Sequence, residues 1–375
     1  MKKTIILIDE PLEGDHRVLK IISNYHNPIV IDCFKFEYNY SNFYDLIFRN
    51  IWMILYTSIY IPIFWVKFYQ KYHLKPDKII RGLKASLRAN YYADKTTNMI
   101  KSTYNNSEID AIYANDLNCA LVGIKLSKFF ECKFIYDAHE VEFHRNRKNS
   151  LFRVVFDMLL EQQVVDAATK VIVVNKPIKK LYIDIYKIPE SKITIVDNNH
   201  FSPHMGYAIS MFNENIHEIA VVYVGGGINN RKLESLACDS SQEEVKIYSF
   251  FLSKTPDIAY KHNWILGSTD YLPELLELIK KKRSVMWACT EDICLSYRLS
   301  LPNKFFQAMA VGIPVIAYKG TYLAEIVQEY NLGYVYNDHN FGEIMEHLKD
   351  SKKYYALLEF VSLFQEKLFV EKMVL

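Results

Sequence analysis

The feature that most constrains the fold of this chain is the stretch of residues 300–318, SLPNKFFQAMAVGIPVIAY. It has the pattern of a loop, a helix, a tight turn and a buried strand. Pro302 suits the first turn of a helix, and Gly312 followed by Pro314 suits a helix end. The apolar run after Pro314 is typical of a parallel strand that is covered on both faces. A helix that leads directly into such a strand predicts a βαβ unit.

The loop before this helix lies where ligands bind in open parallel sheets. Residues 284–289 (SVMWAC) form another apolar run, which predicts the strand that precedes the loop. The loop therefore leaves the carboxyl end of one strand and enters the amino end of a helix, a position that favours anions. Lys304, in the first helical turn, adds a positive charge there. The alternative is an ordinary βαβ unit with a surface lysine.

The segment LPNKFFQAMAVGIPVIA resembles the nucleotide-sugar motif of retaining GT-B glycosyltransferases of the family-4 (group 1) type. The resemblance implies an α/β protein with the GT-B fold, in which two Rossmann-like, doubly wound domains face each other across a cleft. It also implies that the donor is bound by Pro302, Asn303, Lys304 and Gln307. The family has a glutamate at the position of Gln307 and a second acid at the position of Leu299. Gln307 can still hydrogen-bond a ribose hydroxyl, but a neutral amide bonds more weakly than a carboxylate.

Length and composition are those of a globular protein with two domains. The chain has 375 residues, of which 50% are hydrophobic and 23% charged, and its net charge of +2 argues against a dedicated nucleic-acid binder. Its six cysteines form no C-x-x-C pair, which favours reduced cytosolic thiols over disulfides or a zinc site. The N-terminus begins like a signal peptide, but its apolar run is too short, so a first strand is predicted.

The N-terminal residues predict a doubly wound domain. Apolar runs at residues 4–8 and 28–33 flank a polar loop and a helix. The loop lacks G-x-G-x-x-G, so no dinucleotide site is predicted. The segment GDHRVLK is similar to the family's loop after the first strand, which implies that Gly14 and Arg17 lie on the acceptor side. The alternative for this loop is a helix cap with solvated charges.

A hydrophobic segment inside the first domain predicts contact with a membrane. Residues 51–66 carry no charge, and seven Lys or Arg residues against one Asp follow between residues 67 and 88. A spanning helix needs ~20 apolar residues, so this segment is too short to cross the bilayer. Trp52 and Trp65, near its ends, suit a headgroup interface.

We therefore expect a cytoplasmic protein that is peripheral on the inner face of the membrane. Its contact would run through residues 49–88, within an insertion of about residues 45–90. The alternative is a hydrophobic helical hairpin that packs in the domain and exposes a solvated basic face.

Two predicted strands of the first domain end in polar residues. The runs DAIY (110–113) and KFIY (133–136) are followed by Asn115-Asp116 and by the segment D-A-H-E at 137–140. This segment resembles the acceptor-side loop of the same family, which places a histidine near the reacting sugar. The resemblance implies three catalytic residues, His139, Asp137 and Glu140, and two acceptor-side residues, Asn115 and Asp116. The alternative is a cluster that caps a helix.

A polar stretch marks the predicted domain boundary. Residues 197–199 (DNN) end a predicted strand where the family carries P-N-G, and of these three only Asn198 matches. We expect a first domain over residues 1–205 and a second over residues 206–375. The amphipathic segment 354–370 predicts a final helix, which in GT-B proteins often crosses back to the first domain.

A glycine-rich turn opens the second domain. The apolar run 218–224 is followed by three glycines, whose backbone N–H groups can face a phosphate. The family uses this loop, and a basic residue beyond it, against the donor diphosphate. The resemblance thus extends the predicted donor-binding set to Gly225, Gly226, Gly227, Arg231 and Lys232. Of the two basic residues we favour Arg231, because a guanidinium binds phosphate in a bidentate manner. The alternative is an ordinary tight turn.

The motifs that are absent narrow the chemistry. The sequence has no D-x-D, so fixed cations and helix dipoles are expected to neutralise the leaving group in place of a metal ion. It also has no G-x-S-x-G, H-E-x-x-H or P-loop. No metal site and no cofactor are predicted.

Together with the resemblance, these observations predict a retaining, metal-independent glycosyltransferase. Its partners would be a nucleotide-diphosphate sugar and a saccharide or lipid-linked saccharide acceptor, in bacterial-type synthesis of a capsule, a lipopolysaccharide or another surface glycoconjugate. One alternative is a non-catalytic GT-B protein that binds a sugar nucleotide or a partner protein, since both family acids are replaced. Another is a sugar-nucleotide epimerase.

Overall fold

The computed structural model describes most of the chain, in two compact units. The first unit comprises Met1–His200 with Cys294–Ser296, and the second comprises Phe201–Ile293 and Tyr297–Leu375. The described residues are 3–8, 18–19, 22–25, 27–33, 51–64, 83–145, 151–199, 201–227, 231–243 and 245–375.

The first unit is built around a parallel sheet. Among the described residues the sheet has six strands in the order β2-β1-β3-β4-β5-β6. The strands are apolar and largely buried, because helices cover them. Their bounds are β1 Lys3–Ile8, β2 Ile29–Asp32, β3 Ile109–Asn115, β4 Lys133–Ala138, β5 Lys170–Val173 and β6 Ile193–Ile195.

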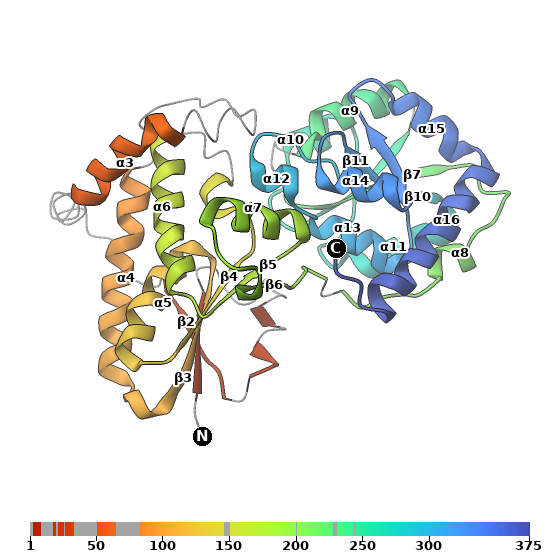
Figure 1. Ribbon diagram of the computed structural model, residues 1–375. Helices are drawn as coiled ribbons and strands as arrows, with labels where there is room; N and C mark the ends of the chain where they lie inside the picture. The colour runs from red at the N-terminus through yellow and green to blue at the C-terminus, as the bar shows by residue number, and fades with distance from the viewer. Residues whose placement is uncertain are drawn as a thin grey trace. The chain divides into compact units, whose positions relative to one another are not determined.

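The helices of the first unit pack in layers on this sheet (Figure 1). Helix α5 lies against β3 and β4, α4 and α6 pack on α5, α3 packs on α6, and α7 lies beside β6. A buried stripe on α6, which includes Phe152, Phe156 and Leu160, faces this interior. The helix bounds are α3 Ile51–Phe64, α4 Leu83–Thr103, α5 Asp116–Phe130, α6 Leu151–Ala167 and α7 Lys176–Tyr186.

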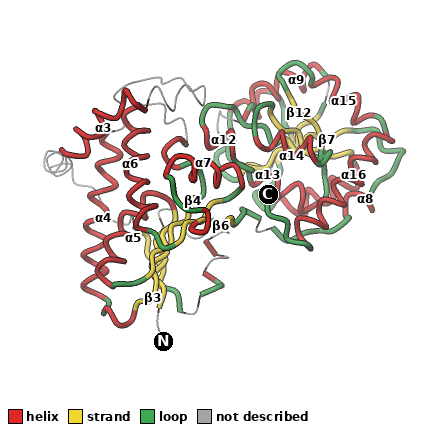
Figure 2. Tube along the Cα trace, in the orientation of Figure 1, coloured by secondary structure: helices red, strands yellow, loops and turns green. Residues whose placement is uncertain are grey.

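The second unit repeats the same architecture. Its described residues form a six-stranded parallel sheet in the order β12-β11-β10-β7-β8-β9. Figure 2 shows the strands of each unit gathered among their helices. The strand bounds are β7 Ile219–Gly225, β8 Lys246–Phe251, β9 Ile265–Leu266, β10 Arg283–Trp287, β11 Val315–Tyr318 and β12 Gly333–Tyr336. The prediction of two doubly wound, Rossmann-like units is confirmed.

The last long helix of the chain packs inside the second unit. Helix α16 contacts α8, α13 and α15, and a short π-helical turn, Glu366–Val370, continues it. The prediction that a final helix crosses back to the first domain stays a prediction. The helix bounds are α8 Tyr207–Ser210, α9 Leu233–Gln242, α10 Asp257–Lys261, α11 Tyr271–Lys281, α12 Leu295–Leu299, α13 Asn303–Val311, α14 Tyr322–Glu329, α15 Phe341–Lys349 and α16 Ser351–Gln365.

The βαβ unit predicted from residues 284–318 is confirmed. Strand β10 pairs in parallel with β11, with Met286 opposite Val315, and helix α13 lies between them in the chain. Gly312 ends α13 with φ = 79°, a conformation that costs glycine little. Pro302 is the N-cap residue of α13, one position before the predicted first turn.

Helix α3 turns an apolar face to the outside. It begins the predicted membrane segment and packs on α6, yet Trp52 is 81% exposed and Ile59 67% exposed. Leu55 and Tyr56 lie on the same face and are also exposed. In the part of the chain that the structure describes, no helix is both long and apolar enough to cross a membrane.

Candidate functional site

Polar residues gather at the carboxyl edge of the first sheet. Asn115 is the last residue of β3, and its register partner on β4 is Asp137. Asp116 follows with φ = 60°, a left-handed backbone conformation that few residues other than glycine adopt. Backbone of this kind is often retained at functional sites. The turn from β3 into α5 therefore fixes Asp116 beside the end of β4.

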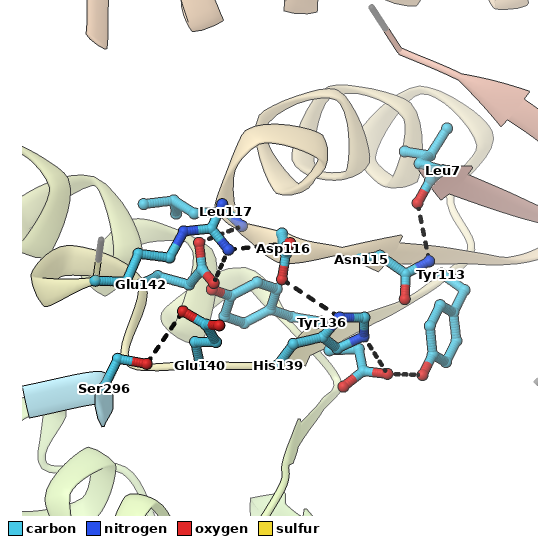
Figure 3. Close-up of polar contacts among 12 residues, drawn as sticks. Leu7, Tyr113, Asn115, Asp116, Leu117, Tyr136, His139, Glu140, Glu142 and Ser296 are labelled. Carbon is cyan, nitrogen blue, oxygen red and sulfur yellow. Dashed lines mark hydrogen bonds and ion pairs between the residues drawn. The ribbon is translucent and has the colours of Figure 1, made fainter. Parts of the chain in front are cut away.

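His139 lies between two carboxylates at this edge. Its Nδ1 is 3.7 Å from Asp116 Oδ1, and its Nε2 is 3.5 Å from Asp137 Oδ2. Figure 3 shows the imidazole ring beside Asp116 and near Tyr113. The Tyr113 hydroxyl donates a hydrogen bond to the same oxygen of Asp137. The structure thus brings together four residues that the sequence predicted, Asn115, Asp116, Asp137 and His139.

Arg145 supplies a counter-charge to this cluster. Its Nη1 lies 3.2 Å from Asp116 Oδ2 and 3.0 Å from Glu142 Oε1. Burial by itself would raise the pKa of Asp116, but the charges of His139 and Arg145 outweigh burial and lower it. Asp116 is therefore an ionised acceptor of hydrogen bonds.

Glu140 has different neighbours. The Ser296 hydroxyl donates a hydrogen bond to Glu140 Oε2 at 3.1 Å, as Figure 3 shows. The adjacent Leu295 N–H donates to His144 Nδ1 at 2.9 Å. Both partners belong to the short stretch Cys294–Ser296, which is part of the first unit. Glu140 is therefore tied to Ser296, whereas Asp137 lies against His139.

Sequence reasoning missed three members of this site: Tyr113, Glu142 and Arg145. The run VEFHR directly follows D-A-H-E, and its acid and bases beside a strand end could have indicated Glu142 and Arg145. Tyr113 gives no such signal, because it occupies an ordinary strand position. The predicted acceptor-side residues Gly14 and Arg17 lie outside the described residues.

The glycine turn of the second unit makes room for a lysine. Gly225 ends β7 with φ = 145°, and a Cβ atom there would lie 3.0 Å from Lys304 Nζ. The same Nζ lies 4.9 Å from the centre of the Tyr223 ring, and the Tyr223 hydroxyl donates to Gly226 O at 2.6 Å. The ammonium group therefore lies beside the backbone at the carboxyl end of β7.

Gly227 is required for packing. A Cβ atom at this position would lie only 2.5 Å from Lys254 O. A side chain would therefore force the turn away from the following loop, whatever ligand the turn binds.

Two cations at this edge lack an acidic partner. Lys304 is only 6% exposed, and among the described residues neither Lys304 nor Arg231 forms an ion pair. The Arg231 guanidinium lies 5.1 Å from the centre of the Tyr297 ring. Burial, followed by the charge of Arg231, lowers the pKa of Lys304 well below its usual value. Two neighbouring positive charges without a counter-ion favour an anionic ligand.

Lys232, by contrast, has an acidic partner. Its Nζ lies 2.9 Å from Asp338 Oδ1, and the Tyr318 hydroxyl donates to Asp338 Oδ2 at 2.6 Å. Burial disfavours the charged lysine, but the bonds to Asp338 and Tyr318 outweigh burial and raise the pKa of Lys232. The sequence had not indicated Asp338, which is 106 residues away. Of the two adjacent basic residues, Arg231 is the one without such a partner.

The other predicted donor-side residues lie on or next to α13. Pro302 caps the helix, Asn303 is its exposed first residue, and Gln307 is buried one turn later. Burial raises the pKa of Tyr271, and the nearby Gln307 side chain opposes that rise. The predicted contact of Gln307 with a ribose stays a prediction.

Among the described residues, no group of three or more His, Cys, Asp or Glu side chains is arranged to hold a metal ion.

Comparison with known proteins identifies the fold. No family model and no curated protein matches the sequence. Among solved structures, HepE from Anabaena in complex with UDP is 13% identical, with a TM-score of 0.61, over 98% of this chain and 95% of that chain. Sucrose-phosphate synthase from Thermosynechococcus elongatus is also 13% identical, with a TM-score of 0.58 over 99% of both chains.

This chain has the GT-B fold. The lipopolysaccharide outer core galactosyltransferase WaaB is likewise similar, with 13% identity and a TM-score of 0.54 over 99% of this chain and 100% of that chain. In the GT-B fold of this protein, the first Rossmann-like unit carries His139 and Asp116. The second carries Arg231 and Lys304. The fold predicted from the motif at residues 300–318 is thus confirmed.

Proposed function

We propose that this protein is a glycosyltransferase that moves a sugar from a nucleotide-diphosphate sugar to a saccharide or lipid-linked saccharide. The observation that carries the proposal is the pair Arg231 and Lys304, two cations without carboxylate partners beside the glycine turn of the second unit. A diphosphate is the ligand that such a pair suits, because its charge matches two fixed cations in a site with little water.

The proposed diphosphate site uses three kinds of group. Arg231 offers a planar fork of donors, Lys304 a buried point charge, and Gly225 a backbone that an anion can approach closely. The N-terminus of α13 adds the positive end of the helix dipole. Charge that develops on the leaving diphosphate would be stabilised by these groups, which need little rearrangement during the reaction.

The stereochemistry, the metal independence and the donor nucleotide are proposed from the sequence and from proteins of similar fold. The resemblance of residues 300–318 to the motif of retaining enzymes supports transfer with retention, and the absence of a D-x-D motif supports transfer without a bound metal ion. Structures of HepE contain UDP, UDP with glucose, or UDP-glucose, which supports a uridine diphosphate donor for this protein. In the first unit, His139 and Asp137 are the proposed contacts near the reacting sugar, with Asn115 and Asp116 on the acceptor side.

Nucleotide binding by defined variants tests this proposal. We expect UDP or another nucleoside diphosphate to raise the melting temperature of the wild type, in EDTA as well as in Mg²⁺. Arg231→Gln and Lys304→Gln should each weaken binding at least about tenfold, since a charge-assisted bond contributes about 1.5–3 kcal/mol. Lys246→Gln is the matched control, because Lys246 is exposed at the amino end of β8. Equal binding by all three variants would contradict the proposed site.

A non-catalytic binding protein is the second candidate. The replacement of both family acids, by Leu299 and Gln307, favours it. Mass spectrometry of lipid-linked and free saccharide acceptors, incubated with nucleotide sugars, separates the two. A product heavier by one sugar establishes the transferase, binding without product establishes the binding protein, and conversion of donor without acceptor establishes an epimerase.

We also propose that α3 holds the protein on the cytoplasmic face of an anionic membrane. The exposed apolar face of α3 and the basic residues between 67 and 88 suit insertion into headgroups together with attraction to acidic lipid. This location would fit an acceptor carried on a lipid, as in synthesis of a capsule or lipopolysaccharide.

Flotation with vesicles tests the membrane proposal. We expect the wild type to float with vesicles that contain acidic lipid at low salt, and Trp52→Glu with Ile59→Glu to remain in solution. Tyr260→Glu is the control, because Tyr260 is 62% exposed on the second unit. Wild-type protein that stays in solution beside acidic vesicles would contradict the proposal.

A further inference from the structure

The last turn of α13 is held by groups from outside the helix. The final carbonyl groups of a helix have no partner within it, so other parts of the protein must supply donors. The His204 N–H donates to Ala310 O at 2.6 Å, and Gln365 Nε2 donates to Met309 O at 2.6 Å. His204 lies near the start of the second unit, whereas Gln365 is the last residue of α16. Two segments that are distant in the sequence therefore fix the end of this helix.

Gln365 uses both ends of its side-chain amide. The residue is 0% exposed, and its Oε1 accepts a hydrogen bond from the Gly206 N–H at 3.1 Å. A backbone N–H can only donate and the Met309 carbonyl can only accept, so the orientation of the amide is fixed. A Cβ atom at Gly312 would lie 3.3 Å from Gln365 Oε1 and 3.4 Å from its Nε2. The glycine that ends α13 therefore also makes room for this side chain.

The opposite end of α13 carries Lys304. Its neighbour Phe305 packs against Phe364 of α16, with ring centres 6.0 Å apart, so α16 contacts α13 near both of its ends (Figure 1). Residues 304–311 are all buried. Hydrogen bonds within the helix join its turns into one rigid body. A displacement at the last turn of α13 would therefore move Lys304 relative to the glycine turn.

We propose that Gln365 is a positioning residue for the donor. By holding the last turn of α13, it fixes where Lys304 lies beside the glycine turn. The identification of the ligand as a nucleotide diphosphate rests on the proposed function. A misplacement of about 1 Å, caused by a change far from the reacting atoms, can cost an enzyme about 100-fold. Loss of the two Gln365 hydrogen bonds should therefore weaken nucleotide binding from the far end of the helix.

Two substitutions of Gln365 separate its hydrogen bonds from its volume. Gln365→Met keeps a similar volume and removes both hydrogen bonds. Gln365→Glu keeps the shape and makes the bond to Met309 O depend on pH, because only a protonated carboxyl group has an O–H to donate. Burial and the negative end of the α13 dipole both disfavour a carboxylate here, so the pKa of the new glutamate should lie above its usual value. Gln328→Glu makes the same change at an exposed position on α14 and serves as the control.

The experiment measures the affinity for UDP by calorimetry from about pH 5 to about pH 9, at a temperature where circular dichroism shows every variant to be folded. Each affinity is divided by that of the wild type at the same pH, which cancels the titration of UDP and of groups that the proteins share. We expect Gln365→Met to bind about tenfold more weakly than the wild type throughout. Gln365→Glu should match the wild type at the acidic end and bind about tenfold more weakly at the alkaline end. Gln328→Glu should match the wild type throughout.

A double-mutant cycle tests whether Gln365 acts through Lys304. In Lys304→Gln the charge that Gln365 positions is already absent, so adding Gln365→Met should weaken UDP binding no further. A purely structural Gln365 would change the stability of the second unit but not the affinity of the folded protein. Unchanged binding by Gln365→Met, a relative affinity of Gln365→Glu that does not vary with pH, or losses that add in the double variant would each overturn the proposal. A wild type that binds no nucleoside diphosphate would instead contradict the proposed function, on which this inference depends.

Discussion

Lys304 combines burial with charge, and the two conflict. Its ammonium group lies beside Gly225 and Tyr223, near Arg231, without a carboxylate partner among the described residues. Burial, and then the charge of Arg231, lower its pKa well below the usual value. The unfolded chain therefore binds more protons than the folded protein between this lowered pKa and ~10.4, so stability without ligand should rise with pH across that range.

We predict that Lys304→Met makes the ligand-free protein more stable and weakens nucleotide binding. Methionine fills a similar volume without the buried charge, so the free energy of unfolding near neutral pH should rise by about 1–3 kcal/mol. The rise in stability with pH should be smaller than in the wild type. Urea unfolding at several pH values, together with titration of UDP, checks both effects. A variant less stable than the wild type would contradict the account of Lys304.

We predict that Gly225→Ala weakens nucleotide binding at the proposed diphosphate site more than Gly320→Ala does. Gly225 and Gly320 both have positive φ, so alanine is strained at either position. A Cβ atom added at Gly225 would crowd Lys304 Nζ, whereas a Cβ atom added at Gly320 would have no other atom within 4 Å. Both variants should lose stability, but Gly225→Ala alone should bind UDP more weakly, by about tenfold. Equal affinities of the two variants in a UDP titration would show that the close approach of Lys304 to Gly225 does not matter for binding.

At the scale of elements, a buried carboxylate joins a strand and two helices of the first unit. Glu161 on α6 accepts hydrogen bonds from three tyrosines: Tyr136 on β4 and Tyr186 on α7, each at 2.6 Å, and Tyr182 on α7. Burial, and then the charge of Glu161, raise the pKa of all three phenols, so they remain protonated donors. One side chain thus fixes how α6 and α7 pack near the sheet.

We predict that Glu161→Ala destabilises the first unit by about 3 kcal/mol or more, because three buried hydroxyl groups lose their acceptor together. Tyr186→Phe should cost only about 1 kcal/mol, since it removes one donor and leaves two. Gln163→Ala, at an exposed position on α6, should stay within about 0.5 kcal/mol of the wild type. Urea unfolding compares the three. Similar losses for Glu161→Ala and Tyr186→Phe would show that the network does not act through Glu161.

At the scale of the whole molecule, the chain is two Rossmann-like units, each with its own sheet and buried core. The proposed nucleotide site belongs to the second unit, and the proposed sugar site belongs to the first. A ligand stabilises the unit that binds it, by about 2.7 kcal/mol at 100 times its dissociation constant. Two-domain chains of this kind need not unfold in one step.

We predict two unfolding transitions in calorimetry, and we expect UDP to raise the midpoint temperature of only one of them. Lys304→Met should raise the midpoint of that same transition in the absence of ligand, whereas Glu161→Ala should lower the midpoint of the other. The two variants thereby assign each transition to a unit. A single transition, or an equal shift of both by UDP, would show that the units do not unfold independently.

The sequence predicted the fold well because the signals were local. Apolar runs of four to seven residues became buried parallel strands, and Gly312 and Pro302 mark the ends of α13. Glycines predicted a turn after β7, and Gly225 has the positive φ that such a turn uses. The sequence also indicated which strand ends carry polar residues, since the carboxyl ends of parallel strands share one edge.

Partners across the fold required the tertiary structure. The sequence alone determined that Arg231, Lys232 and Lys304 follow strand ends. It could not show which of these three positive charges is paired with an acid. The structure decided that Lys232 pairs with Asp338, 106 residues away, whereas Arg231 and Lys304 have no such partner among the described residues. It likewise decided that Arg145 holds one oxygen of Asp116 while the other lacks a donor. The physical reason is range: backbone conformation depends on near neighbours, whereas the charge and hydrogen bonding of a site depend on which distant loops the sheet brings together.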